Sequence, residues 1–549
     1  MEPPSSASAS LLSAPNLNHL WAQLLVEELI RSGVRTFLVA PGSRSTPLTT
    51  AAARNPRART VVHVDERGTA FAALGYGRAT GRPAGWITTS GTAVANGLPA
   101  VVEAGTDGVP MLLLTADRPP ELRDTAANQT INQVKIFGEY VRWQFDLPTP
   151  TRDIEPQMVL TTADQAVHRA RRMPPGPVHL NCMFRKPLAP IKDGDDYAHY
   201  TADLQAWATA EAPYTSYPRS TMAPDAASIQ RVAETIEDLS RGLIVAGRLA
   251  SVDEQKAVRA LADHLGWPLL PDVTSGLRLG RKSAETRIAH FDQVLASAAF
   301  RGEHAPDAVL HLGGRFVSKR LRQFITAARP KHLIVAGPDP SRIDPAHQVT
   351  QRIETDIEPF CSALRDEMEA QANSEWRAAW QQAETQAHTT LDSFAATETT
   401  LSEPLIARLV SQHIPPEQAL VPASSMPVRD MQRYGAADGS TVPVFANRGA
   451  SGIDGTVATA AGIAIARSAP ATLVIGDLAL LHDLNSLQLL RQAPVIVIAI
   501  NNDGGGIFHF LPIADVDDVF EPYFATPQGR SFESAAAMFD LPYAQPSSP

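Results

Sequence analysis

Two polar turns in the C-terminal part of the chain carry residues that could bind a metal ion. Asp477 follows a short apolar run at 472–475, and Asn502 follows a β-branched run at 494–500. Both runs suit buried parallel strands, and ligands of open α/β sheets bind beyond the carboxyl ends of such strands. A carboxylate and an amide oxygen, 25 positions apart, suit Mg²⁺, which often keeps a ligand's phosphates in its shell. The glycines from Gly504 onward let backbone approach that ligand closely. The alternative is a bare βαβ unit whose polar turns only cap the strands.

A carboxylate that could exchange protons stands at the start of a predicted helix. A strand is expected at 61–64 and a helix at 68–80, with Glu66 between them. Burial raises the pKa of a carboxyl group, so a partly buried Glu66 could share a proton with a nitrogen base. The alternative is that Asp65 and Glu66 only interact with the helix dipole. The residues alone leave both open.

A third turn has the composition of an anion site. It follows an expected strand at 36–40 and contains Ser43, Arg44 and Ser45. Hydroxyl and guanidinium groups at the end of a strand can hold a carboxylate or a phosphate. A simple helix N-cap by Ser43 or Ser45 explains the same residues equally well.

The elements that must position these turns are alternating strands and helices, which predict an α/β protein of three doubly wound parallel-sheet domains. The mixed, Pro- and Ser-containing segment after the first domain indicates a linker, and the Ala- and Gln-rich segment before the third indicates a connecting helix. The expected parts are a disordered tail at 1–16, domains at 17–193, 226–365 and 403–549, the linker at 194–225 and the connecting helix at 366–402.

Length and composition narrow the class of protein. A chain of 549 residues with 44% hydrophobic residues suits about three globular domains. A net charge of −10 argues against a general nucleic-acid binder. Cys182 and Cys361 stand far apart, which argues against a disulfide framework or a zinc site and fits a reducing cytoplasm. No apolar run approaches the length of a membrane span.

Several stretches together resemble one family, the thiamine-diphosphate-dependent 2-succinyl-5-enolpyruvyl-6-hydroxy-3-cyclohexene-1-carboxylate synthases of menaquinone or phylloquinone biosynthesis. The likeness covers nearly the whole chain and is looser in the middle domain. The stretches are A-P-G-S-R-S-T-P-L from Ala40, H-V-D-E-R-G from His63, T-S-G-T-A-V-A-N from Thr89, L-T-A-D-R-P-P-E-L from Leu114, N-R-G-A-S-G-I-D-G from Asn447, G-D-L-A-L-L-H-D-L-N from Gly476 and N-N-D-G-G-G-I-F from Asn501.

This resemblance implies the thiamine-diphosphate-binding fold and a transferase reaction. The family decarboxylates 2-oxoglutarate and adds the resulting succinyl-semialdehyde carbanion to isochorismate, with release of CO2. It implies thiamine diphosphate and Mg²⁺, or Mn²⁺, as cofactors. It also implies a homodimer or homotetramer with sites at the subunit interface, and no nucleic-acid partner.

The resemblance also assigns roles to residues. Glu66 is the catalytic acid that activates the cofactor at N1′ of its aminopyrimidine, and Asp477, Asn502 and the carbonyl of Gly504 are the metal ligands. The residues expected to face isochorismate are Ser43, Arg44, Arg118, Gln129 and Lys319, and those expected to hold the succinyl carboxylate or the adduct are Ser425, Arg429 and Arg448. The remaining cofactor contacts are Ser424, Ile453, Ile507 and Phe508.

Two departures from the family pattern stand out. Ala423 and Ser424 replace the usual Gly-Asn pair, so the cofactor contact of that Asn passes to Ser424. Relatives continue for several tens of residues beyond the position of Pro549, through one more strand and helix, so that either the tail is divergent or the sequence is incomplete. A missing last strand would expose a sheet edge in the third domain.

Two other functions remain alternatives. The first is another thiamine-diphosphate-dependent 2-oxo acid decarboxylase or carboligase, against which the S-R-S and D-R-P-P-E-L segments argue. The second is a non-catalytic nucleotide-binding relative on the same fold. The presence of Glu66 together with Asp477 and Asn502 argues against it, because a binder needs no such acid.

Overall fold

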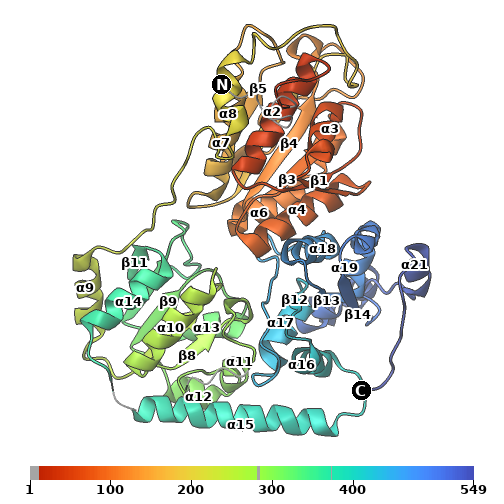
Figure 1. Ribbon diagram of the computed structural model, residues 1–549. Coiled ribbons are helices and arrows are strands. Elements are labelled where there is room, and N and C mark those ends of the chain that lie inside the picture. The colour runs from red at the N-terminus through yellow and green to blue at the C-terminus, as the bar shows by residue number, and fades with distance from the viewer. Residues whose placement is uncertain (1–10, 281–284, 372–373) are drawn as a thin grey trace. The chain divides into compact units, whose positions relative to one another are not determined.

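The computed structural model describes residues 11–280, 285–371 and 374–549, and Figure 1 follows the chain through them. The chain forms two compact units. The first comprises Met1–Arg219, Asn447–Ala471 and Ala479–Val495, and the second comprises Ser220–Ala446, Thr472–Leu478 and Ile496–Pro549. Sheets covered by helices make up both units, which confirms the predicted α/β class.

The first unit contains a six-stranded sheet in the order β2-β1-β3-β4-β6-β5, in which every recorded pairing is parallel. Its four central strands are completely buried, because helices cover both faces and the strand sequences are mainly apolar. The carboxyl ends of these strands share one edge, so the turns that follow them gather there. The strands are β1 (Thr36–Val39), β2 (Arg59–Val62), β3 (Gly85–Thr88), β4 (Met111–Asp117), β5 (Trp143–Leu147) and β6 (Pro177–Met183).

The helices of this unit follow the expected alternation. Helix α2 (Leu17–Arg31) belongs to this unit, and Asn16 caps it by accepting a hydrogen bond from the backbone N–H of His19. The strand expected at 61–64 begins and ends two residues earlier, because Asp65 already caps the next helix. Between residues 11 and 200, where the structure describes the chain, the other helices with eight or more residues are α3 (Thr46–Arg54), α4 (Glu66–Thr80), α6 (Leu98–Asp107) and α7 (Gln157–Arg171).

Segments expected to lie outside the first domain contribute to its core. Residues 1–10 of the predicted tail lie outside the described residues, but Leu12 is buried in the hydrophobic core beside α2. Tyr197, Leu204 and Trp207, from the predicted linker, are buried in the same core. The core of this unit therefore extends beyond residue 193.

Helix α18 (Thr456–Arg467) also belongs to the first unit, where it packs along α4 (Figure 1). The two backbones approach each other closely at glycines. A Cβ atom at Gly75 would lie 2.1 Å from the carbonyl oxygen of Thr459, and one at Gly462 would lie 2.0 Å from that of Ala72. This packing fixes the segment before α18 against the helices of the first sheet.

The second unit contains a five-stranded parallel sheet and a three-stranded sheet. The first has the order β11-β10-β9-β7-β8, with β7 (Gly242–Ala246), β8 (Leu269–Pro271), β9 (Ala308–Leu312), β10 (His332–Gly337) and β11 (Gln351–Glu354). The second has the order β12-β13-β14, with β12 (Ala419–Pro422), β13 (Ala471–Gly476) and β14 (Val495–Ile500). Strand β14 lies at an edge, and its Ile496 is 52% exposed.

The long helix α15 (Glu375–Thr397) falls within the range expected for a connecting helix. Cys182 and Cys361 are buried free thiols. Among the described residues, no helix has both the length and the apolar composition needed to cross a membrane.

Candidate active site

Glu66 is the first residue of α4, directly after the cap residue Asp65, whose side chain accepts the backbone N–H of Arg67 at 2.9 Å. The Glu66 carboxyl group is half-buried, and its Oε2 accepts a hydrogen bond from Nδ2 of Asn96 at 3.1 Å. Asn96 ends the short helix α5 (Thr92–Ala95) after β3. The carboxyl group is therefore oriented by one side chain and keeps a half-exposed face.

Arg44 and Arg118 lie close together at the carboxyl edge of the same sheet. Each is 8% exposed. Arg44 donates a hydrogen bond to the carbonyl oxygen of Phe184 at 2.8 Å, and Arg118 donates to the hydroxyl of Ser90. Burial, and then the charge of Arg118, lowers the pKa of Arg44. Two buried guanidinium groups with mainly neutral partners form a site that suits a dianion.

Gln129 joins this arrangement from a loop. It has a φ of 56°, its Nε2 donates to the carbonyl oxygen of Ser90 at 3.0 Å, and its own carbonyl accepts from the Ser90 hydroxyl at 3.1 Å. Ser43 is exposed on the turn after β1. Ser45 precedes α3 but makes no side-chain cap, because its hydroxyl donates to Gly42 O. The N-cap alternative therefore does not explain these serines.

Asp477 is the first residue of α19 (Asp477–His482), and it is 4% exposed. Its Oδ1 accepts the backbone N–H of Leu478 at 2.8 Å and its Oδ2 accepts that of Gly504 at 2.7 Å. Burial raises the pKa of this carboxyl group. Gly504 has a φ of 133°, and a Cβ atom there would lie 2.0 Å from the carbonyl oxygen of Ala525. Only glycine therefore fits at position 504. The hydrogen bond also places Asp477 and Gly504, two predicted metal ligands from distant turns, next to each other.

Asn502, the third predicted ligand, is exposed. Its Nδ2 donates to Oε1 of Glu403 at 2.7 Å, which turns the amide oxygen away from that carboxylate. A carboxylate, an amide oxygen and a backbone carbonyl are ligands that Mg²⁺ accepts, so the residues present fit this ion. No group of three or more His, Cys, Asp and Glu suitable for a metal occurs among the described residues.

The remaining predicted residues divide between the two units. Arg448 and Ile453 lie in the first, on the loop before α18, and Ile453 is 37% exposed. The others lie in the second unit. Ser424 is buried, and Ser425 stands at the N-cap position of α17 (Met426–Tyr434) with a φ of 71° and no side-chain cap. The carbonyl oxygen of Ser425 accepts the guanidinium of Arg429. Lys319 is exposed at the start of α13 (Lys319–Ala328). Ile507 and Phe508 are half-buried, and Phe508 packs edge-on against Phe524.

Three residues that hold predicted site groups carry no role assigned from the sequence. Ser90 and Asn96 lie in the T-S-G-T-A-V-A-N stretch. This stretch carries part of the family resemblance, but its pattern does not indicate which of its residues contact the site groups. Glu403 stands 99 positions from Asn502, and nothing in its surroundings distinguishes it from an ordinary first-turn carboxylate of a helix.

Comparisons with known proteins point to one family. Residues 21–136 match the family model described as thiamine pyrophosphate enzyme, N-terminal TPP binding domain, and residues 198–421 match the middle domain of thiamine pyrophosphate enzymes. Three similar curated proteins are each named 2-succinyl-5-enolpyruvyl-6-hydroxy-3-cyclohexene-1-carboxylate synthase. The one from Salinibacter ruber is 58% identical over 99% of this chain and 92% of its own length, that from Rubrobacter xylanophilus 55% over 97% and 92%, and that from Chlorobium chlorochromatii 44% over 96% and 90%.

Proposed function

The chain belongs to the family of 2-succinyl-5-enolpyruvyl-6-hydroxy-3-cyclohexene-1-carboxylate synthases, and from this premise we propose which of its residues carry the reaction. It is a thiamine-diphosphate-dependent enzyme of menaquinone biosynthesis. It decarboxylates 2-oxoglutarate and joins the remaining succinyl semialdehyde unit to isochorismate. The observation that carries this conclusion is the 58% identity over 99% of the chain, which leaves little room for a different 2-oxo acid enzyme or a non-catalytic relative.

Asp477, Asn502 and the carbonyl oxygen of Gly504 would hold Mg²⁺, or Mn²⁺ in its place, and through it the diphosphate of the cofactor. The hydrogen bond between Asp477 and the backbone of Gly504 supports this assignment, because it keeps two ligands together before the ion binds. When bound, thiamine diphosphate supplies a carbon nucleophile and accepts the electron pair released by decarboxylation.

Glu66 would hold and transfer a proton at N1′ of the aminopyrimidine. Its half-buried position and its single oriented oxygen support this role, because a proton-exchanging group must remain reachable. The side chains that would surround the cofactor are those of Ser424, Ile453, Ile507 and Phe508.

The two substrates carry carboxylates, and arginines would bind them. The neighbouring buried guanidinium groups of Arg44 and Arg118 support the isochorismate site, to which we also assign Ser43, Gln129 and Lys319. Ser425, Arg429 and Arg448 would hold the distal carboxylate of 2-oxoglutarate. Replacing Arg429 with Ala should impair use of 2-oxoglutarate by roughly 30-fold or more and use of pyruvate much less, since a lost buried charge partner costs about 2–5 kcal/mol. Equal losses for both acids, measured as kcat/KM, would refute the assignment.

We further propose a cytoplasmic homodimer, alone or paired into a homotetramer, with two sites shared between subunits. Glu66 belongs to the first compact unit and Asp477 to the second, yet one cofactor needs both groups. Two-fold symmetry would give two equivalent sites, each with the acid of one subunit and the metal ligands of the other. The buried free cysteines suit a reducing compartment.

A mixed-subunit experiment tests the assignments and the sharing together. Glu66→Gln and Asp477→Ala chains are each expected to be nearly inactive. When equal amounts are refolded together, half of the dimers should be mixed, each with one intact site of two, so roughly a quarter of the wild-type activity should return. Mixed dimers that form by native mass spectrometry and stay inactive would contradict the shared site.

A further inference from the structure

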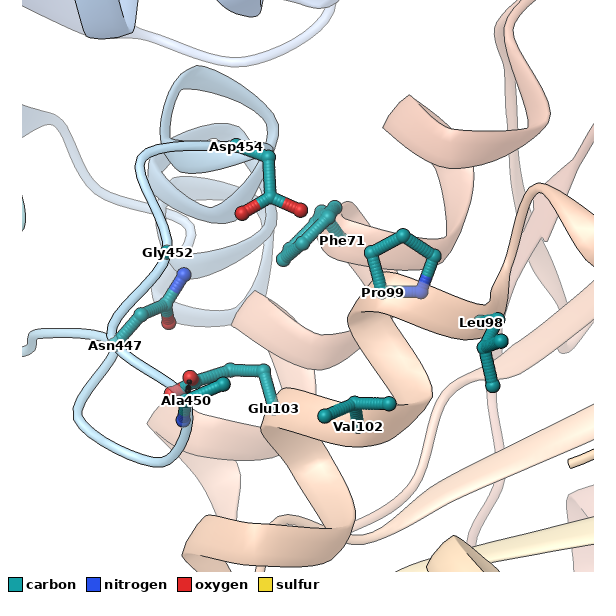
Figure 2. Close-up of a pocket in the computed structure, with 9 residues that line it drawn as sticks. All are labelled: Phe71, Leu98, Pro99, Val102, Glu103, Asn447, Ala450, Gly452 and Asp454. Atoms are coloured by element: carbon teal, nitrogen blue, oxygen red, sulfur yellow. Dashed lines mark hydrogen bonds between the residues drawn. The ribbon is translucent and has the colours of Figure 1, made fainter. Parts of the chain in front are cut away.

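The loop between Asn447 and Gly455 carries two of the proposed contacts, Arg448 and Ile453, and is held by residues to which the reaction assigns no role. Three successive backbone N–H groups in this loop converge on one carboxylate. Glu103 Oε1 accepts from Gly449 at 2.8 Å, and Glu103 Oε2 accepts from Ala450 at 2.7 Å and Ser451 at 3.1 Å. Figure 2 shows Glu103 on α6 beside Ala450 of the loop.

Glu103 is itself fixed by an ion-pair network. Nη2 of Arg78, near the end of α4, lies 3.0 Å from Oε1 of Glu103, and Nη1 of Arg78 pairs with Asp107. The side chains of Arg78, Glu103 and Asp107 are 3%, 3% and 6% exposed. A buried carboxylate needs such charged and hydrogen-bonding partners, so the loop and Arg78 together satisfy Glu103.

The loop also fits tightly against α6 at one point. A Cβ atom at Gly449 would lie 2.5 Å from the carbonyl oxygen of Glu103 and 3.1 Å from Cβ of Asp107. Ser451 has a φ of 60°, and a turn through the left-handed region can direct successive N–H groups toward a single anion. The close approach at Gly449 and the turn at Ser451 therefore fit the loop backbone to the carboxylate of Glu103.

On one side the loop borders open space. A cavity of about 320 Å³ lies beside it, and its lining includes Phe71, Leu98, Val102, Asn447 and Asp454 (Figure 2). A segment that borders a cavity has room to shift, unlike one enclosed by packed side chains. The three hydrogen bonds to Glu103 therefore contribute to holding the middle of the loop in place.

We propose that Glu103, supported by Arg78, is a positioning residue that sets the place of Arg448 for the carboxylate of the 2-oxo acid. This inference rests on the proposed function, in which Arg448 binds that carboxylate. Glu103 touches neither substrate nor cofactor in this role. By holding the backbone of residues 449–451, Glu103 affects how strongly the enzyme prefers 2-oxoglutarate over other 2-oxo acids.

The test compares Glu103→Gln with a matched control. A glutamine has one acceptor oxygen where glutamate has two. Its NH2 group would therefore face a backbone N–H donor of the loop, and the repulsion between the two donors should displace the loop. The kcat/KM ratio of 2-oxoglutarate to pyruvate should fall roughly tenfold, the effect of losing one well-oriented hydrogen bond to a charged group. Glu27→Gln is the control, since Glu27 is equally buried and pairs with Arg31 and Arg57 away from the loop. It should lower stability and leave the ratio unchanged.

A second readout needs neither cofactor nor substrate. In the apo protein, trypsin should cut after Arg448 several times faster in Glu103→Gln than in the wild type or in Glu27→Gln, with the fragments identified by mass spectrometry. If Glu103→Gln does not fold, Gly449→Ala displaces the loop with the carboxylate left intact, because the new methyl group would meet the carbonyl oxygen of Glu103 on α6. Gly449→Ala should also lower the kcat/KM ratio of 2-oxoglutarate to pyruvate and speed tryptic cleavage after Arg448.

A double-mutant cycle separates this inference from the proposed function. In an Arg448→Ala background, Glu103→Gln should change the substrate ratio by less than about twofold, because its effect passes through Arg448. If Arg448→Ala alone leaves the ratio unchanged, the proposed function of Arg448 is wrong. If Arg448→Ala lowers the ratio but neither Glu103→Gln nor Gly449→Ala does, the positioning role is wrong.

Discussion

Two turns of this protein place a carboxylate at the first residue of a helix after a strand, and they hold it differently. Glu66 is half-buried and receives one hydrogen bond, from the side chain of Asn96. Asp477 is 4% exposed and receives backbone N–H groups on both oxygens, from Leu478 and Gly504. The local sequence pattern is similar, but the surroundings are not.

The difference matches the proposed tasks. A group that exchanges a proton has to change charge during turnover, and an environment that fixed both oxygens on backbone donors would favour only the ionised form. A metal ligand stays ionised and has to present its lone pairs at a fixed place, which rigid backbone donors achieve. Glu66 therefore has an adjustable partner, whereas Asp477 has two rigid ones.

The largest effect is expected for Glu66→Gln, which keeps the shape and removes the titratable proton. Turnover should fall by about 10²- to 10⁴-fold, the usual contribution of general acid–base catalysis. Cofactor affinity, measured by calorimetry, should change little. Asp65→Asn, at the cap of the same helix, is the control and should affect stability more than turnover. Turnover within a few-fold of wild type in Glu66→Gln would remove the catalytic role of this residue.

Asp477→Asn should act on binding, not on proton transfer. The variant loses the charge of the proposed metal ligand and one acceptor for backbone N–H, so affinity for Mn²⁺ with cofactor should weaken by about 100-fold. Electron paramagnetic resonance of Mn²⁺ would measure it. Asp503→Asn is the matched control, because this exposed carboxylate accepts from Gln528 and Gly529 in the same turn. Unchanged affinity in Asp477→Asn would place the metal elsewhere.

Glu28 shows what burial does to a carboxyl group without a ligand role. Burial, with a further contribution from Asp164, raises its pKa from 4.5 to about 8. The folded protein keeps a proton that the unfolded chain releases, so stability is lost as pH rises from 4.5 through about 8. Relative to Glu28→Gln, which does not titrate, the wild type should lose roughly 3–4 kcal/mol between pH 5 and pH 8. Urea unfolding at several pH values measures this. A constant difference would contradict the raised pKa.

The smallest effect is expected for Asn96→Ala, which removes the one side-chain partner of Glu66. Turnover should fall by roughly tenfold, the value of one hydrogen bond to a charged group, and metal affinity should stay the same. Asn55→Ala is the control, because Asn55 donates to Glu27 in a comparable bond outside the site. If both variants lower turnover equally, the Asn96 bond only supports the fold.

The sequence by itself determined the strand ends and the turns that carry the site. Continuous apolar runs predicted β13 and β14, and polar residues with glycines after them predicted Asp477 and Asn502 at one sheet edge. These signals are local, since a buried parallel strand and the turn after it are encoded within a few residues. The motifs also gave the family, which full-length relatives confirm.

Only the tertiary structure decided which side chains hold those residues. Glu403 bonds Asn502 across 99 positions, and Glu103 receives backbone N–H groups from residues 346 to 348 positions away. Backbone donors are the same at every residue except proline, so the sequence of the loop carries no mark of the carboxylate it will meet. The packing of α4 against α18 brings that loop to α6, and this packing is a property of the whole fold.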